Sequence, residues 1–259
     1  MLALQGVGVL VTRPEQQAMP LCRLLEASGA IALRLPAIEI KPLGDAHELK
    51  TRLGALEAFD LIIFTSANAV RFGAPLLTLQ REPTLAAIGP ATARALDQAG
   101  YRVTITPTGG FDSESLLLHP KLANPAGLRV LIVKGMNGRE LLQEELARRG
   151  AQVVIAGVYK RERAVHDAAE LAALEAKLVA GEIQVITATS AEIAASLLAT
   201  ATPAVRREFN RVHWLVPGAR VAAALRERGV TAPILQADTA EDQDLVAAII
   251  RWRSCASGA

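Results

Sequence analysis

The fold is decided by the stretch VLVTRP at residues 9–14, which returns as VLIVKG at residues 130–135. In the first copy the apolar run predicts a buried strand, and Pro14 predicts the start of a helix, because proline is tolerated at the first helical position. The helix has an apolar stripe at the i, i+3, i+4 and i+7 spacing, formed by Ala18, Leu21, Cys22 and Leu25. Gly29 indicates where this helix ends, and the mostly apolar run IALRL at residues 31–35 predicts the next strand.

The match between the two copies extends beyond these strands. The same shift lays Gly29-Ala30 on Gly150-Ala151 without a gap. A second pair of segments also repeats, with Thr65-Ser66-Ala67 corresponding to Thr189-Ser190-Ala191. The segments follow one another in the order A, B, A′, B′, which indicates an internal duplication.

Short apolar runs alternate with amphipathic stretches along the chain, and this alternation predicts an α/β fold with mainly parallel sheets. Further strands are expected at 61–64, 85–88, 129–133, 185–188 and 212–216. The segments PAIEIKP (36–42) and AGVYKRER (156–163) occupy equivalent places in the repeat and are interpreted as paired linkers. Periodicity alone leaves two arrangements open: interleaved lobes, or two consecutive domains divided near residue 125.

Composition excludes several classes of protein. Hydrophobic residues make up 51% of the 259 residues, enough for real cores, and a net charge of +2 gives no general field for nucleic acid. No run of 18 apolar residues predicts a membrane span, and the N-terminus has no secretory pattern, so a cytoplasmic protein is expected. Cys22 and Cys255 lie far apart, outside any metal or redox spacing, and are expected to be free thiols.

The loops that follow the expected strands are rich in hydroxyls, glycines and basic side chains, and they contain no Asp, Glu or His. They are Thr12-Arg13-Pro14, Thr65-Ser66-Ala67-Asn68, Gly89-Pro90-Ala91-Thr92, Lys134 to Arg139, Thr189-Ser190 and Pro217-Gly218. Such loops meet at the carboxyl edge of a parallel sheet, where helix N-termini attract anions. They predict an anionic ligand, although the Ser, Thr and Asn residues would also serve simply as helix caps.

Cofactor and metal signatures are missing from the sequence. No G-x-G-x-x-G follows a strand, G-M-N-G-R (135–139) is too short for a phosphate-binding loop, and the four histidines have no ligand spacing. No cofactor and no metal are therefore predicted. Tyr159, one of two tyrosines, lies in a predicted linker, either facing a cleft or covering apolar surface.

Several motifs in order, VLVTRP, LPAIEI, LIIFTSANAV, IGPATARAL and LIVKGMNGRELL followed by VYKR, resemble uroporphyrinogen-III synthase from about Val7 to Leu235. The resemblance implies two flavodoxin-like parallel-sheet lobes joined by a two-stranded linker, with the active site in the cleft between them. Lobe one would be residues 1–36 with 164–259 and lobe two 43–156, with 37–42 and 157–163 as linkers.

The resemblance also implies the reaction. The family cyclises hydroxymethylbilane to uroporphyrinogen III with loss of water and inversion of ring D, without a cofactor. Tyr159 would then be the catalytic residue, a neutral phenol that hydrogen-bonds the leaving hydroxyl. Together with the loop residues above, the expected substrate-binding set is Thr12, Arg13, Thr65, Ser66, Asn68, Gly89, Thr92, Lys134, Gly138, Arg139, Thr189, Ser190 and Pro217.

A monomer is expected, with hydroxymethylbilane as its partner, transient contact with hydroxymethylbilane synthase, and no nucleic acid or membrane. Two alternative functions come from other classes of protein. A bilobed, non-catalytic binder of an organic polyanion fits the same loop composition. A nucleotide-dependent transferase is disfavoured, because the glycine fingerprint and the ribose-binding acid are absent.

Overall fold

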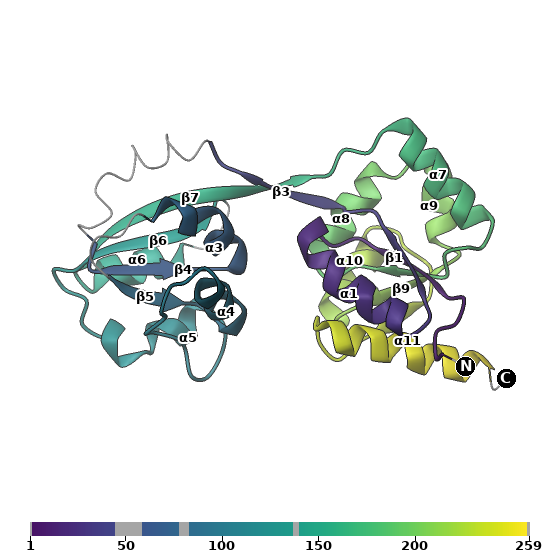
Figure 1. Cartoon of the computed structure of the whole chain (residues 1–259). Helices are drawn as coiled ribbons and strands as arrows, with labels where there is room; N and C mark the ends of the chain where they lie inside the picture. Colours follow the sequence, from purple (N-terminus) through teal and green to yellow (C-terminus); the bar gives the residue numbers. More distant parts are fainter. Residues whose placement is uncertain (1, 45–58, 78–82, 137–139, 258–259) are drawn as a thin grey trace. The chain divides into compact units, whose positions relative to one another are not determined.

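The computed structural model describes residues 2–44, 59–77, 83–136 and 140–257. The chain divides into two compact units, each with its own sheet. Unit 1 comprises Met1–Glu39 and Glu162–Ala259, and unit 2 comprises Ile40–Arg161. The chain therefore leaves unit 1, completes unit 2 and returns, so that both termini belong to unit 1 (Figure 1).

The sheet of unit 1 has five parallel strands in the order β2-β1-β8-β9-β10. They are β1 (Gly8–Val11), β2 (Ile31–Arg34), β8 (Val185–Thr187), β9 (His213–Val216) and β10 (Ile234–Gln236). Numbered along the unit, the order is 2-1-3-4-5, which is that of flavodoxin-like folds. The helices are α1 (Glu15–Ala27), α7 (Ala168–Val179), α8 (Ala191–Thr200), α9 (Pro203–Phe209), α10 (Ala219–Glu227) and α11 (Asp242–Ser257).

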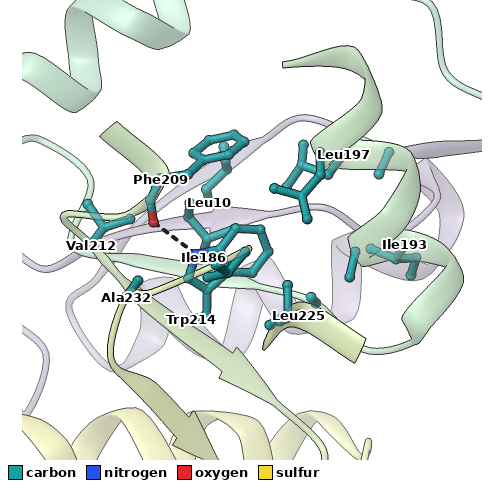
Figure 2. Packing of buried hydrophobic residues seen from close by; sticks show 14 of the residues in the cluster. Leu10, Ile186, Ile193, Leu197, Phe209, Val212, Trp214, Leu225 and Ala232 are labelled. Carbon is teal, nitrogen blue, oxygen red and sulfur yellow. Dashed lines mark hydrogen bonds between the residues drawn. The ribbon is translucent and has the colours of Figure 1, made fainter. Parts of the chain in front are cut away.

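The three central strands of this sheet, β1, β8 and β9, are buried on both faces, and apart from Thr187 and His213 their residues are apolar or glycine. Side chains alternate between the faces, so Val9 and Val11 pack under α1 and α11, whereas Leu10 packs under α8 and α10. Figure 2 shows this second cluster around Trp214, whose ring meets that of Phe209 edge to face at 5.7 Å. The indole N–H donates to the carbonyl of Phe209 at 2.9 Å, so the largest buried side chain leaves no donor unsatisfied.

The sheet of unit 2 has the order β3-β7-β6-β4-β5. Its strands are β3 (Ile38–Pro42), β4 (Leu61–Phe64), β5 (Thr84–Ala87), β6 (Arg129–Gly135) and β7 (Gln152–Arg163). The last four of that order are parallel, and Ile105 adds an isolated parallel bridge to Ala86 beside β5. The helices are α3 (Ala67–Gly73), α4 (Pro90–Gln98), α5 (Ser113–Leu117) and α6 (Leu141–Arg148), with 3₁₀ turns η2 (Ala74–Leu76) and η3 (Pro120–Leu122).

The two sheets are built on the same plan. The run β7-β6-β4-β5 repeats the run β2-β1-β8-β9, and the bridge at Ile105 takes the place of β10. Strands from segments A and B′ thus share one sheet, and strands from B and A′ share the other. The sequence-based prediction of an α/β chain with two flavodoxin-like parallel sheets is confirmed.

The division between the units falls within β3 and β7. Leu43 donates to the carbonyl of Val158, and Ala164 donates to that of Ala37, so the two segments run antiparallel. β7 keeps its pairing with β6 as far as Tyr159. Residues 157–159, which the sequence assigned to a linker, therefore belong to the sheet of unit 2.

Candidate active site

The carboxyl edge of the unit 2 sheet brings together several of the predicted site residues. After β4, the Thr65 amide and hydroxyl both donate to the carbonyl of Val133, at 3.1 and 3.3 Å, which ties this turn to β6. Ser66 then begins α3 as its N-cap, and its Oγ accepts the amide hydrogen of Ala69 at 3.0 Å. Both hydroxyls thus have structural roles at the edge where ligands bind in such sheets.

Tyr159 reaches the same place from β7. Its side chain is 5% exposed, and its ring stacks on that of Phe72 from α3, with centroids 6.1 Å apart. Its hydroxyl oxygen lies 3.2 Å from Ser66 Oγ, within hydrogen-bonding distance. The phenol therefore places its polar atom at the N-terminus of α3 while its ring is held in the core.

A β-bulge explains how Tyr159 reaches this face. Lys134 pairs with Gly157, but the next residue of β6, Gly135, pairs with Tyr159, so that β7 carries one extra residue. In a regular strand, neighbours such as Val158 and Tyr159 would point to opposite faces. Here both pack in the core cluster that also contains residues of α3 and α4. Bulges re-aim side chains in this way and are common next to active sites.

The other tyrosine has a different role. The Tyr101 hydroxyl donates to the carbonyls of Ala74 and Leu77, at 3.3 and 3.1 Å, and so closes the end of η2. The Tyr101 hydroxyl thus bonds to backbone carbonyls, whereas the Tyr159 hydroxyl lies beside the hydroxyl of Ser66. The two tyrosine hydroxyls therefore differ in their partners, and the predicted catalytic role of Tyr159 stays a prediction.

Gly89 and Thr92 lie at the start of α4, after β5. Gly89 is the N-cap in an extended conformation, and Pro90 occupies the first helical turn. The first N–H groups of a helix have no partner within it, so this end can accept an anion. Thr92 is 3% exposed, which points to packing inside unit 2 as well as to any contact with a ligand.

Four further candidates were predicted for this edge, and the structure describes two of them. Asn68 is half-buried in the first turn of α3, and Lys134 is buried near the end of β6. Gly138 and Arg139 fall outside the described residues, so their predicted role in binding stays a prediction.

At the carboxyl edge of unit 1, the first two candidates are already engaged. Thr12 is fully buried; its hydroxyl donates to the Thr187 carbonyl, and its amide donates to the Thr187 hydroxyl at 3.3 Å. The Arg13 guanidinium forms an ion pair with Asp242 and also donates to the carbonyl of Ala240 and, at 3.4 Å, to Thr189 Oγ1. A substrate carboxylate would have to compete with Asp242 for this arginine.

Ser190 and Pro217 occupy the remaining turns of this edge. Ser190 caps α8 as Ser66 caps α3, accepting the amide hydrogen of Ile193 at 3.1 Å. Pro217 precedes Gly218, the N-cap of α10, whose φ of 93° is in the left-handed region that favours glycine. These turns keep helix N-termini at the edge, as the loop composition predicted.

Sequence reasoning missed one acidic loop. The loops after the expected strands were read as free of carboxylates, but β10 was not among those strands. The loop that follows β10 carries Asp238 and Glu241, and Asp242, the first residue of α11, forms an ion pair with Arg13. The composition argument was therefore incomplete for unit 1, because it left out a carboxylate that pairs with Arg13.

Metal-binding clusters and membrane-spanning helices are both absent from the described part of the chain. No group of three or more His, Cys, Asp or Glu side chains that could hold a metal ion occurs there. Nor is any helix among these residues long and apolar enough to cross a membrane.

Fold and edge chemistry together define a class: a duplicated α/β protein with two flavodoxin-like sheets, whose carboxyl edges carry capped helix N-termini and, in unit 2, a buried tyrosine. The chain belongs to the uroporphyrinogen-III synthase family, since residues 20–247 match the family described as uroporphyrinogen-III synthase HemD. The resemblance stated from the motifs is thereby confirmed.

Two curated relatives and two solved structures agree with this assignment. The uroporphyrinogen-III synthases of Escherichia coli and Salmonella typhimurium are each 34% identical, over 94% of this chain and 100% of theirs. A mutant uroporphyrinogen III synthase from Thermus thermophilus superposes with a TM-score of 0.59 at 25% identity, covering 98% of this chain and 100% of that one. The enzyme from Helicobacter pylori, at 17% identity and a TM-score of 0.63, covers 95% and 99% and supports the fold.

Proposed function

We propose that this chain is a lyase that cyclises hydroxymethylbilane to uroporphyrinogen III, with loss of water and inversion of ring D, in tetrapyrrole biosynthesis. The observation that carries the proposal is the Tyr159 hydroxyl beside Ser66 at the carboxyl edge of unit 2, in a chain that matches the family over residues 20–247.

The first step requires the terminal hydroxyl of the bilane to leave as water. The pyrrole nitrogen supplies the electron pair that expels it, which gives an azafulvene cation. Tyr159 has the chemistry to assist, because a phenol that donates a hydrogen bond to the departing oxygen stabilises the negative charge developing there. A buried ring fixes that donor more firmly than a surface side chain would, and fixed donors contribute most in the transition state.

The second step inverts one ring. The substituted end of ring D attacks the azafulvene carbon, and the spiro intermediate fragments and recloses with ring D reversed. Pyrroles react readily with such a cation, and therefore the protein's main task is to hold the chain in one arrangement. Helix N-termini follow β4, β5, β8 and β9, capped by Ser66 and Ser190 or begun at Gly89 and Gly218, and their free N–H groups would hold the substrate carboxylates.

We further propose that the chain acts as a cytoplasmic monomer, receiving its substrate through transient contact with hydroxymethylbilane synthase and binding no nucleic acid. Support for the last point is the net charge of +2 over 259 residues. Analytical ultracentrifugation of the protein alone measures its oligomeric state, and the same measurement with hydroxymethylbilane synthase added measures their association.

The decisive experiment is an isomer assay. The protein is incubated with hydroxymethylbilane, the product is oxidised to porphyrin, and the isomers are separated by chromatography. Type III porphyrin in excess over the enzyme-free control supports the proposal. Type I alone, which forms by closure without inversion, would leave the chain a non-catalytic binder of an organic polyanion.

A further inference from the structure

We propose that Gly135 and Ser66 are positioning residues for the Tyr159 hydroxyl. Gly135 leaves the space that the phenol ring occupies, and Ser66 donates its own proton to the phenol oxygen. The phenol hydrogen is then free to point at the leaving hydroxyl of the substrate. This inference rests on the proposed function and assigns a specific task to two residues outside the chemistry itself.

The need for glycine at position 135 comes from space and not from backbone conformation. Gly135 is absent from the glycines with positive φ, so an alanine would meet no strain there. A Cβ on Gly135, however, would lie 2.7 Å from Cζ, 2.9 Å from Cε2 and 3.0 Å from the hydroxyl oxygen of Tyr159. These distances are too short for carbon against a ring, and the three atoms form the hydroxyl-bearing end of that ring.

The ring has little freedom to move away. Tyr159 is held by the bulge against β6, by Phe72 stacked at 6.1 Å, and by its amide-linked neighbour Val158 in the same core cluster. Its own carbonyl accepts the amide hydrogen of Met136 at 2.9 Å, which fixes the backbone next to Gly135. Any shift forced by a methyl group at position 135 is thus passed to the phenol oxygen.

Ser66 is placed to donate the hydrogen bond that the proposal requires. Its Oγ accepts the Ala69 amide hydrogen with one lone pair, which leaves the hydroxyl hydrogen of Ser66 available to donate to the phenol oxygen 3.2 Å away. An N–H bond received at the start of a helix polarises the serine hydroxyl and strengthens it as a donor. If Tyr159 instead donated to Ser66, the phenol would have no hydrogen left to donate to the substrate.

Fluorotyrosine labelling gives a direct readout, because the chain has two tyrosines, Tyr101 and Tyr159. The full chain should show two fluorine resonances, of which Tyr159→Phe assigns one. Gly135→Ala should shift the Tyr159 resonance, leave that of Tyr101 in place, and lower kcat by at least about tenfold with KM within about twofold. Gly157→Ala is the matched control: it lies in the adjoining strand, and its Cβ would meet only the end of the Leu43 side chain at 3.3 Å.

A second pair of variants tests Ser66. Ser66→Ala removes the donor and should lower kcat by about tenfold, whereas Ser66→Thr keeps a hydroxyl and should restore most of the rate. In a Tyr159→Phe background, neither Gly135→Ala nor Ser66→Ala should reduce kcat further. Losses that add in the double variants would mean that these residues act elsewhere.

The outcomes separate the two ideas. If the unaltered protein forms no type III isomer, the proposed function fails, while the fluorine resonances still report whether Gly135 and Ser66 set the phenol environment. If type III forms but Gly135→Ala keeps full kcat and an unshifted Tyr159 resonance, the positioning role is overturned. Should Gly135→Ala lose its fold, seen as collapse of the Tyr101 resonance, the Ser66→Ala and Ser66→Thr pair decides by the same criteria.

Discussion

Removing one oxygen from Tyr159 separates its chemical role from its structural one. The Tyr159→Phe variant keeps the buried ring and its stacking on Phe72, and loses only the contact with Ser66 Oγ at 3.2 Å. A hydrogen bond of this kind contributes about 0.5–1.5 kcal/mol to stability. Ser66 keeps its cap to Ala69, so the free energy of unfolding should fall by no more than that. Tyr159→Ala, which empties the ring site, should cost about 3–5 kcal/mol.

The effect on catalysis should be much larger than the effect on stability. Loss of a positioned proton donor is expected to lower kcat about 10²-fold, equivalent to about 2.7 kcal/mol of barrier. The product should remain largely type III, because inversion depends on how the chain is held. Urea denaturation measures stability, and timed oxidation with isomer separation measures rate and product. Full activity in the Phe variant would refute the chemical role, and a change to type I would make Tyr159 a residue that holds the substrate.

Three further predictions follow from the units and their charges. A fragment of residues 40–161 should unfold cooperatively by calorimetry, whereas a fragment of residues 1–125 should not, because it contains β1 and β2 without their sheet neighbours β8 and β9. The reverse result would refute the division of the chain into these two units. Arg139→Ala should raise KM roughly 10- to 150-fold, the loss of one charge-assisted hydrogen bond to a carboxylate, and an unchanged KM would remove Arg139 from the site. Burial lowers the pKa of His213, whose Nε2 accepts the Trp252 indole hydrogen at 3.2 Å. The neutral, buried imidazole therefore contributes fully to the free energy of unfolding above the unfolded pKa near 6.5, and this contribution is lost as pH falls below that value. The urea midpoint of His213→Phe should accordingly drop less than that of the unaltered protein between pH 7.5 and 5.5, and equal drops would rule His213 out as the titrating group.

The fold was predictable from the sequence where a strand was apolar and buried on both faces. The strands at 61–64 and 129–133, buried on both faces, were recognised because their residues, apart from Arg129, are apolar. β10 was not recognised, since Ile234, Leu235 and Gln236 make a three-residue edge strand that is only partly buried. Missing β10 also hid the acidic loop behind it, and with it the partner of Arg13. An ion pair across 229 residues leaves no local pattern to detect.

The candidate site was predictable in part. Ser66 and Ser190 were placed correctly at the starts of helices, because capping residues carry a signal within three positions of the apolar stripe. Tyr159 was assigned to a linker, since alternation in AGVYKRER gives no sign of a bulge. What buries Tyr159 is a register shift against β6, and a register shift depends on two strands at once.

Duplication explains why the two sheet edges share helix caps and yet differ in chemistry. Ser66 and Ser190 are equivalent, and each accepts an amide hydrogen from the third residue along. The alignment that lays residues 9–14 on 130–135 without a gap places Ile38 opposite Tyr159, so unit 1 has no phenol at that position. Unit 1 instead has Arg13 paired with Asp242. The duplicated fold thus supplies two sheet edges with helix N-termini, and one substitution leaves the phenol in unit 2 alone. Replacing Ile38 by tyrosine should leave kcat unchanged in an isomer assay of the Tyr159→Phe variant, because the edge of unit 1 holds Asp242 beside Arg13 and is less favourable to an anionic substrate. Recovery of the lost rate would show that a phenol at either edge suffices.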